Sequence, residues 1–190
     1  MSEIQQQMRW ILHKPVIMVG MMGAGKTAVG RALAAALDVP FRDSDIEIEA
    51  AAAMSVQEIF ERDGEPFFRN REAEVIARLL DESPCVLSTG GGAFLSPRNR
   101  EQIAAHGVSV WLDASVALLW ERVRHKTTRP LLRTPDPQAT LAALFAERTP
   151  IYAQAEIRVP SLPELSIESM ADKVLEVLAQ RKDILEPVNG

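Results

Sequence analysis

Eight residues near the start of the chain constrain its fold more than any other stretch. Residues 20–27 read Gly-Met-Met-Gly-Ala-Gly-Lys-Thr, which fits the pattern of a glycine, four residues and Gly-Lys-Thr that forms a phosphate-binding loop. An apolar, β-rich run at residues 16–19 precedes the loop, and residues 28–37 follow it with apolar side chains at helical spacing. Because a strand, a glycine turn and a helix are the required context, we expect the phosphates of a nucleotide to bind here.

The residue types in this loop indicate its chemistry. Glycines at positions 20, 23 and 25 allow the backbone to curl so that successive N–H groups converge on a polyphosphate. The helix then begins at the anion, with the positive end of its dipole facing it. Lys26 would reach the β- and γ-phosphates, and the Thr27 hydroxyl would bind Mg²⁺. The alternative is a glycine-rich turn that binds nothing, and the complete pattern with correct flanks argues against it.

Composition and charge exclude several classes of protein. With 190 residues, 47% of them hydrophobic and 25% charged, the chain is typical of one soluble globular domain with a sizeable core. A net charge of −5 gives no general attraction to nucleic acid or to an anionic membrane, so an anionic substrate would need locally placed arginines. A single cysteine, Cys85, and the lack of any run long enough to span a membrane predict a cytoplasmic protein.

Strand-like and helical stretches alternate along the chain. This alternation predicts an α/β fold with a parallel sheet covered on both faces and with the ligand loops at its carboxyl edge. Outside these elements we expect a loosely packed extension at residues 1–14, a loop or lid at about 125–137 and a flexible tail at 183–190. We expect strands near residues 16–19, 41–45, 85–88, 108–112 and 155–159, and helices near 28–37, 46–62 (two short helices), 65–80, 97–105, 115–124, 138–148 and 167–180.

Two acidic residues follow the second predicted strand. Asp43 and Asp45 alternate along a stretch expected to be extended, so their side chains should point to opposite sides. One could address a metal ion and the other an acceptor hydroxyl, and phosphoryl transfer needs both functions. Alternatively, Ser44 or Asp45 only caps the helix that follows.

A dense group of charges opens the predicted helix at 65–80. Arg69 could hold a substrate carboxylate in bidentate geometry, which lysine cannot match. Glu72 lies three residues later, on the same helix face, and could hold the guanidinium in position. The alternative is a solvated face whose ion pair contributes little.

Three further features are candidates for ligand binding. Gly90-Gly91-Gly92 follows a strand and is either a flexible turn or a place where the backbone approaches a ligand closely. Arg129, in the predicted lid, could close over the transferring phosphoryl group. Arg148 could be a second anion clamp or only a cation at a helix C-terminus.

Taken in order, these motifs resemble the shikimate kinases, a group of P-loop proteins similar to the nucleoside-monophosphate kinases. The resemblance covers about residues 15–180 and implies a three-layer fold with a five-stranded parallel sheet in the order 2-3-1-4-5 and a mobile lid. It also implies a single kinase domain with a substrate-binding segment at about 46–71, which moves with the lid to exclude water. The motifs are the loop at 20–27, Phe-Arg-Asp-Ser-Asp at 41–45, Phe-Arg and the following Glu at 68–72, the glycine triplet, Arg-Pro-Leu-Leu at 129–132 and Arg-Thr-Pro-Ile-Tyr at 148–152.

The resemblance also implies an activity, transfer of the γ-phosphoryl group of ATP to the 3-hydroxyl of shikimate by a cytoplasmic monomer without nucleic-acid or membrane partners. Arg122 would pack on adenine, and Asp45, Lys26 and Arg129 would carry catalysis. The stretch at residues 160–163 lacks the basic residue that some members carry. The remaining implied contacts are Gly23, Ala24, Gly25, Lys26, Thr27, Ala28, Arg122 and Arg129 for the nucleotide, Thr27 and Asp43 for Mg²⁺, and Asp45, Arg69, Gly91, Gly92 and Arg148 for shikimate.

Two other functions remain as alternatives. A related kinase for gluconate would share the phosphate-binding loop, but Arg69, Arg148 and the glycine triplet together resemble a shikimate pocket. A non-catalytic domain that senses shikimate would share the pocket, but the proposed catalytic residues are intact and nothing basic or helix-turn-helix-like precedes the domain.

Overall fold

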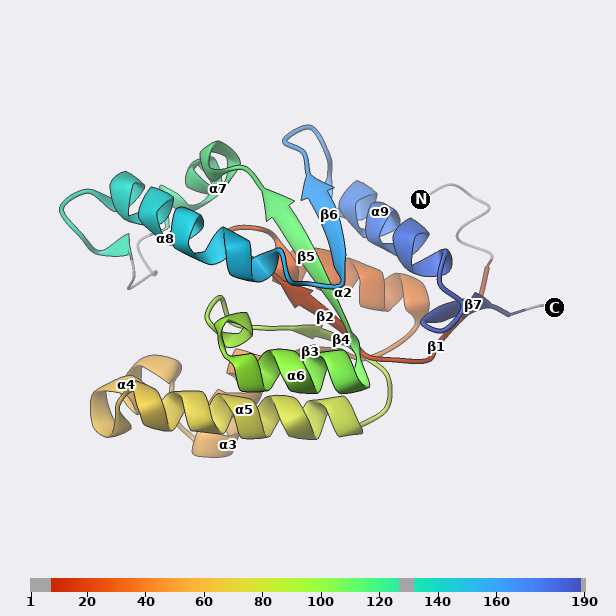
Figure 1. Cartoon of the computed structure of the whole chain (residues 1–190), viewed down its shortest axis with the longest axis horizontal. Coiled ribbons are helices and arrows are strands. Elements are labelled where there is room, and N and C mark those ends of the chain that lie inside the picture. The colour runs from red at the N-terminus through yellow and green to blue at the C-terminus, as the bar shows by residue number, and fades with distance from the viewer. Residues whose placement is uncertain (1–7, 127–131, 189–190) are drawn as a thin grey trace.

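A computed structural model describes residues 8–126 and 132–188 of the chain. Its centre is a parallel sheet in the order β3-β4-β2-β5-β6 (Figure 1). Counted along the chain from β2, this order is 2-3-1-4-5, as the family resemblance implied. The strands are β2 (Val16–Val19), β3 (Phe41–Asp43), β4 (Val86–Ser88), β5 (Val108–Ala114) and β6 (Ile157–Ser161).

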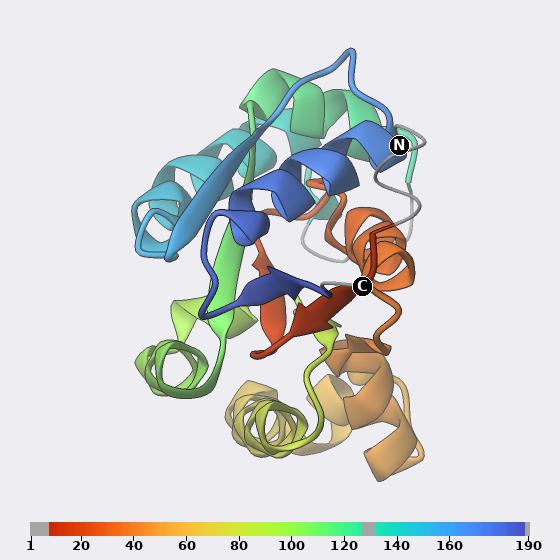
Figure 2. The ribbon, with the colours of Figure 1, turned by 90° about the vertical axis from the view of Figure 1, so that its right-hand side faces the viewer.

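Helices cover both faces of the sheet. Helices α2 and α9 pack against each other on one face, and α5 and α6 pack against each other on the opposite side (Figures 1 and 2). The segment α3–α4 packs on α5 beyond the β3 edge. The helices are α2 (Lys26–Leu37), α3 (Ser44–Ala52), α4 (Val56–Asp63), α5 (Glu65–Asp81), the short 3₁₀ helix η1 (Ala93–Leu95), α6 (Pro97–His106), α7 (Val116–Val123), α8 (Pro137–Tyr152) and α9 (Ile167–Ala179).

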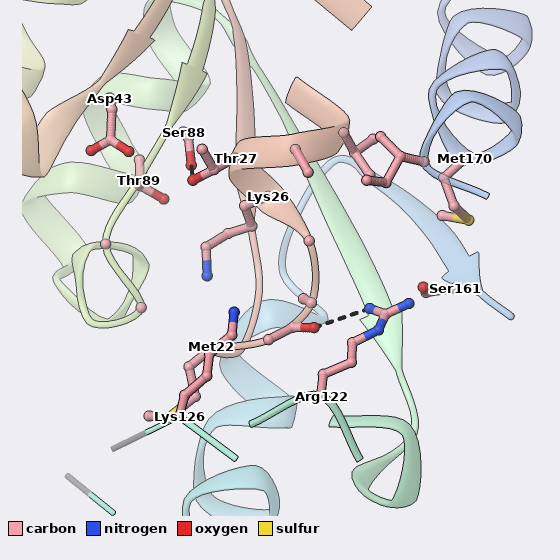
Figure 3. Close-up of a pocket in the computed structure, with 18 of the residues that line it drawn as sticks. Met22, Lys26, Thr27, Asp43, Ser88, Thr89, Arg122, Lys126, Ser161 and Met170 are labelled. Carbon is pink, nitrogen blue, oxygen red and sulfur yellow. Dashed lines mark hydrogen bonds between the residues drawn. The ribbon is translucent and has the colours of Figure 1, made fainter. Parts of the chain in front are cut away.

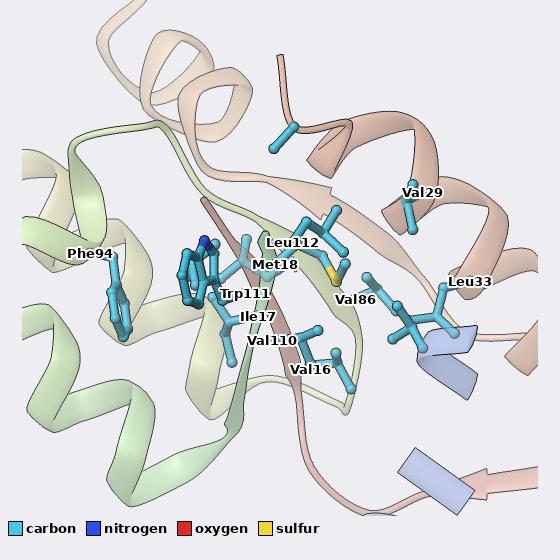
Figure 4. Close-up of a cluster of buried hydrophobic side chains, with 14 of the residues drawn as sticks. Val16, Ile17, Met18, Val29, Leu33, Val86, Phe94, Val110, Trp111 and Leu112 are labelled. Carbon is cyan, nitrogen blue, oxygen red and sulfur yellow. The ribbon is translucent and has the colours of Figure 1, made fainter. Parts of the chain in front are cut away.

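The core is built on the central strand β2, whose four residues are all fully buried. Because side chains alternate along a strand, Met18 faces α2 and Ile17 faces α6 (Figure 4). Gly30 in α2 lets that helix approach the sheet, since a Cβ there would lie 3.0 Å from the Phe41 ring. This packing sets the start of α2, and with it the phosphate-binding loop, at the carboxyl edge of the sheet.

Both ends of the described chain are more ordered than the sequence predicts. Strand β1 (Trp10–Leu12) pairs antiparallel with β7 (Leu185–Pro187), in segments predicted to be a loose extension and a flexible tail. Leu12 and Leu185 are partners in this ladder, and both are buried in the core. The pairing joins segments at opposite ends of the sequence, and three-residue strands show no periodicity that sequence patterns could detect.

Helix α8 also ends later than predicted. The sequence predicted a helix over residues 138–148, but the helix continues through Pro150 to Tyr152. Arg148 therefore lies inside the helix and is buried, so the interpretation of Arg148 as a cation at the helix terminus is wrong. Within the described residues, no helix is both long enough and apolar enough to cross a membrane.

Candidate active site

A single pocket of about 610 Å³ collects residues that follow the strands at the carboxyl edge of the sheet. Lys26 and Thr27 follow β2, Asp43 ends β3, Thr89 follows β4, and Arg122 comes from the helix after β5 (Figure 3). The far wall, from β6 and α9, is more apolar. It contains Ser161, Leu165, Ser166, Ile167 and Met170.

The phosphate-binding loop requires glycine for its backbone conformation. Gly20, Gly23 and Gly25 have φ angles of +143°, +81° and +92°, which L side chains rarely adopt. At Gly23 a Cβ would also lie 2.7 Å from a methyl group of Val123. Gly25 is the N-cap of α2 and makes no side-chain cap hydrogen bond, so the first N–H groups of the helix suit an anion.

Lys26 and Thr27 open α2 and line the pocket. The Lys26 ammonium donates to the carbonyl oxygens of Gly20, at 2.6 Å, and Met21, at 3.1 Å, so the lysine folds over its own loop. The Thr27 hydroxyl lies 3.4 Å from the hydroxyl of Ser88, at the end of β4. Ser88 and Thr89 were not predicted as site residues, although polar residues directly after a buried strand are a signal for such positions.

Arg122 attaches α7 to the phosphate-binding loop. Its Nη1 donates to the Gly23 carbonyl oxygen at 3.0 Å, and burial lowers the pKa of the guanidinium (Figure 3). Arg122 thus lies between the loop and the apolar wall that includes Met170. This location is compatible with the adenine contact that the family resemblance implies.

The two acidic residues after β3 are arranged differently from the prediction. The strand ends at Asp43 and α3 begins at Ser44, so residues 43–45 do not alternate along an extended stretch. Asp43 is the helix cap, and its Oδ1 accepts from the N–H groups of Asp45, at 2.9 Å, and Ile46, at 3.3 Å. The helix turn brings Asp43 and Asp45 to the same pocket. Neither Ser44 nor Asp45, the two predicted capping residues, is the cap.

The pKa of Asp45 is influenced by charges from both parts of the site. Burial raises the pKa of its carboxyl, and the negative charge of Asp43 raises it further. The positive charges of Lys26 and Arg69 act in the opposite direction. A carboxylate with a raised pKa inside a pocket is a candidate proton acceptor.

The glycine triplet is in contact with three charged side chains. A Cβ on Gly90 would lie 2.9 Å from the Asp45 carboxylate, and one on Gly91 would lie 3.4 Å from Arg148 Nη1. A Cβ on Gly92 would overlap the Arg69 guanidinium, with Nη1 at 2.7 Å. The triplet therefore provides the space in which Asp45, Arg69 and Arg148 converge. Gly90 was missed as a site residue, although it belongs to the same sequence triplet.

Arg69 is held by a buried partner. Its Nη1 donates to Glu72 Oε1 at 2.9 Å, and Glu72 is only 1% exposed. The second carboxylate oxygen of Glu72 is buried without a hydrogen-bond partner among the described residues. Burial raises the pKa of Glu72, while the charge and hydrogen bond of Arg69 oppose this shift. The alternative of a solvated surface pair is therefore wrong.

Arg148 is the second arginine of this group, and unlike Arg69 it is buried. It is 8% exposed, and its Nη1 is buried with no hydrogen-bond partner in the part of the chain that the structure describes. A buried charged donor that lacks a partner is costly, and an anionic ligand would relieve that cost. The third predicted arginine, Arg129, lies outside the described residues.

This fold and site define a class: P-loop kinases that act on small molecules. A nucleotide-binding loop follows the first strand of the 2-3-1-4-5 sheet. Beside it, the half-buried Arg69 and the buried Arg148 stand near a carboxylate. The chain belongs to the shikimate kinase family, since the family model described as shikimate kinase matches residues 22–179. It is therefore an ATP-dependent small-molecule kinase.

Two curated relatives extend this match over most of the chain. The shikimate kinase of Ruegeria pomeroyi is 67% identical over 92% of this chain and 90% of its own length. That of Cereibacter sphaeroides is 63% identical over 92% of this chain and 87% of its own length.

Solved structures agree with the sequence relatives. A shikimate kinase from Acinetobacter baumannii in complex with shikimate superposes with a TM-score of 0.83 at 37% identity, covering 89% of this chain and 94% of that chain. A gluconokinase from Sinorhizobium meliloti reaches a TM-score of 0.56 at 22% identity, covering 89% of this chain and 95% of that chain, and shares the fold alone.

Proposed function

We propose that the protein transfers the γ-phosphoryl group of ATP to the 3-hydroxyl of shikimate, giving shikimate 3-phosphate and ADP. The observation that carries this proposal is the convergence of Asp45, Arg69 and Arg148 on the glycine triplet, next to the phosphate-binding loop. Membership of the family and the likeness to a structure in complex with shikimate support it.

On the donor side, the N–H groups of residues 23–28 and the Lys26 ammonium would hold the phosphates. On nucleotide binding, Lys26 would exchange the carbonyl oxygens of its own loop for phosphate oxygens. Arg122 would pack on the base. Arg129 would stabilise the charge of the transferring phosphoryl group. The lid at 125–137 and the segment at 46–71 would move to exclude water.

Thr27 and Asp43 would hold Mg²⁺, and their chemistry fits that ion. Both offer hard oxygen ligands in the pocket, and Asp43 Oδ2 makes no hydrogen bond to any described residue. Clusters of three or more histidine, cysteine or acidic side chains that could hold a metal are absent from the described residues, which suits an ion bound largely by phosphates and water. When bound, Mg²⁺ supplies neutralisation of charge on the phosphates.

On the acceptor side, Arg69 and Arg148 would grip the substrate carboxylate, and Asp45 would orient the hydroxyl. As the bond from the hydroxyl oxygen to the γ-phosphorus forms, the hydroxyl proton passes to the Asp45 carboxylate. The bond from that phosphorus to the β–γ bridging oxygen breaks, and ADP leaves. The raised pKa of Asp45 favours its service as the base in this step.

We also propose that the protein works as a cytoplasmic monomer. Its single cysteine, Cys85, is buried and free, which suits a reducing compartment. Light scattering on the purified protein with and without both substrates tests the oligomeric state, and a stable dimer would contradict this part of the proposal.

A coupled assay for ADP formation tests the activity. Purified protein with MgATP should release ADP only when shikimate is added, and phosphorus NMR should show one new phosphate monoester. Gluconate in place of shikimate is the control substrate. Turnover with gluconate but not shikimate would identify a different kinase, and shikimate binding without turnover would identify a sensing domain.

A further inference from the structure

Tyr152 has no role in the steps above, yet it contacts the acceptor site directly. It is the last residue of α8, the only tyrosine in the chain, and 1% exposed. Its hydroxyl donates to the Gly91 carbonyl oxygen at 2.5 Å. The hydrogen bond joins the end of α8 to the middle glycine of the triplet, across 61 residues of sequence.

The same tyrosine contacts Arg148. The two residues are four apart in α8 and lie on one helix face. Burial raises the pKa of the Tyr152 phenol, while the charge and a hydrogen bond of Arg148 oppose that rise. The unpartnered Nη1 of Arg148 lies beside Gly91. Tyr152 therefore contacts both Arg148 and the Gly91 backbone that Arg148 faces.

Aromatic neighbours on two sides fix the Tyr152 ring. Phe94 in η1, just after the triplet, stacks on it with the ring centroids 6.5 Å apart. Trp111 in β5 stacks on it at 6.4 Å. Since this packing does not involve the hydroxyl, phenylalanine at position 152 would keep the ring in place and lose only its polar contacts.

We propose that Tyr152 is a positioning residue for the acceptor: its hydroxyl fixes the glycine triplet against α8, so that Arg148 presents its free guanidinium nitrogen to the substrate carboxylate. This inference rests on the proposed function, because it assigns Arg148 to the shikimate carboxylate. It differs from a purely structural role for the hydroxyl, which would affect stability without favouring one substrate.

The Tyr152→Phe variant tests the proposal through the two KM values. We expect the KM for shikimate to rise about tenfold, as for the loss of one hydrogen bond in a charged network. The KM for ATP should change by less than about twofold and kcat by less than about threefold, because the residues of the donor pocket are untouched.

Ser109→Ala is the matched control. Ser109 is another buried hydroxyl, and it accepts a hydrogen bond from the Glu156 N–H at 2.9 Å, on β5 and away from the pocket. Its removal should lower the melting temperature as much as Tyr152→Phe does, or more, without altering either KM.

A second measurement needs no mutation. Because the chain has one tyrosine, protein grown with 3-fluorotyrosine gives a single fluorine NMR signal from position 152. Saturating shikimate should shift this signal, and saturating ADP alone should leave it in place.

The outcomes separate the two proposals. Wild-type protein that fails to turn over shikimate rejects the proposed function and, with it, the role of Tyr152. Active wild-type protein rejects the role of Tyr152 alone if the variant weakens both substrates equally, if neither KM moves, or if shikimate leaves the fluorine signal unchanged.

Discussion

Two glycine-rich loops follow neighbouring parallel strands at the same edge of the sheet, and they need glycine for different reasons. After β2, Gly20, Gly23 and Gly25 have positive φ angles, so the backbone itself excludes most other residues. After β4, no described glycine of the triplet has a positive φ, and Gly92 sits at −91°. There the Asp45, Arg148 and Arg69 side chains fill the space that a Cβ would need.

The difference indicates where each half of the site gets its specificity. The donor loop is a property of one short stretch, and it can bind phosphate in any protein that forms it. The acceptor site depends on side chains from α3, α5 and α8 that meet at the glycine triplet after β4. Glu72 and Arg148 are buried there and partly unpartnered, so the acceptor site is more sensitive to single substitutions that leave the nucleotide site unchanged.

The largest expected effect separates the two halves chemically. Asp45→Asn removes the proposed proton acceptor, so kcat should fall about 10³-fold. The Kd for ATP, measured by calorimetry, should stay within about twofold, because phosphate binding depends on the neighbouring loop. Equal losses of turnover and ATP affinity would mean that Asp45 is structural and that the two halves are not independent.

Arg69→Lys probes the acceptor half without changing its charge. Lysine cannot reproduce a bidentate contact with a carboxylate and would leave Glu72 with a poorer partner. The KM for shikimate should rise about 30-fold, the scale of one lost charge-assisted hydrogen bond. Steady-state kinetics with ATP varied should show little change in the KM for ATP. An unaltered shikimate KM would remove Arg69 from the clamp.

Alanine at one glycine of each loop tests the comparison directly. Gly23→Ala forces a positive φ on alanine and pushes against Val123, so it should destabilise the protein by about 1–3 kcal/mol and weaken ATP binding. Gly92→Ala has an ordinary φ and displaces only the flexible end of Arg69. It should raise the KM for shikimate about tenfold, by analogy with losing one hydrogen bond, with little loss of stability.

Chemical denaturation of both glycine variants measures the free energy of unfolding, and substrate titration measures the ATP affinity and the KM for shikimate. If Gly92→Ala is as destabilising as Gly23→Ala, the triplet is also a backbone requirement and the contrast between the loops is lost.

The smallest expected effect is a gain in stability. The pKa of Asp45 is raised on folding, so the folded chain holds this proton more tightly than the unfolded chain. That contribution is complete below the ordinary value of 3.8 and is lost as the pH rises through the folded pKa. Asp45→Asn, which never loses a proton, should therefore melt a few degrees higher than wild type at pH 7, about the shift that 1 kcal/mol gives in a chain of this size.

Melting curves from pH 4 to pH 8 check the sign. The advantage of the variant should shrink as the pH falls toward 4, because wild-type Asp45, whose pKa is raised, becomes increasingly protonated. A variant that melts lower than wild type at pH 7 would show that the attraction of Lys26 and Arg69 outweighs burial.

The same contrast explains how much the sequence could predict. The donor loop was predicted from one contiguous motif, and the structure has the expected strand, turn and helix there. The strand order was predicted from the family resemblance, and it agrees with the structure. Arg69 alone would have passed for a surface residue, because only the fold shows that Glu72 is buried. The contact of Tyr152 with Gly91 joins residues 61 apart in the sequence, and no spacing rule indicates it.

Local errors had local causes. Asp43 and Asp45 were expected to alternate because the helix start at Ser44 was missed, and the capping role of the Asp43 carboxylate decides that start. The predicted helix ended at residue 148, although α8 continues through Pro150 to Tyr152. At the start of α3, one capping side chain outweighs the average tendency of its neighbours.

The β1–β7 pair has a mechanical consequence. Its outermost register pair is Trp10 and Pro187, and the Val188 N–H donates to the Arg9 carbonyl oxygen just beyond that pair. A force that pulls these two segments apart would therefore break the backbone hydrogen bonds between β1 and β7 one after another, from the outer end inward to Leu12. The force would reach the parallel sheet only after β1 and β7 had separated. The β1–β7 pair would therefore yield before the kinase core does.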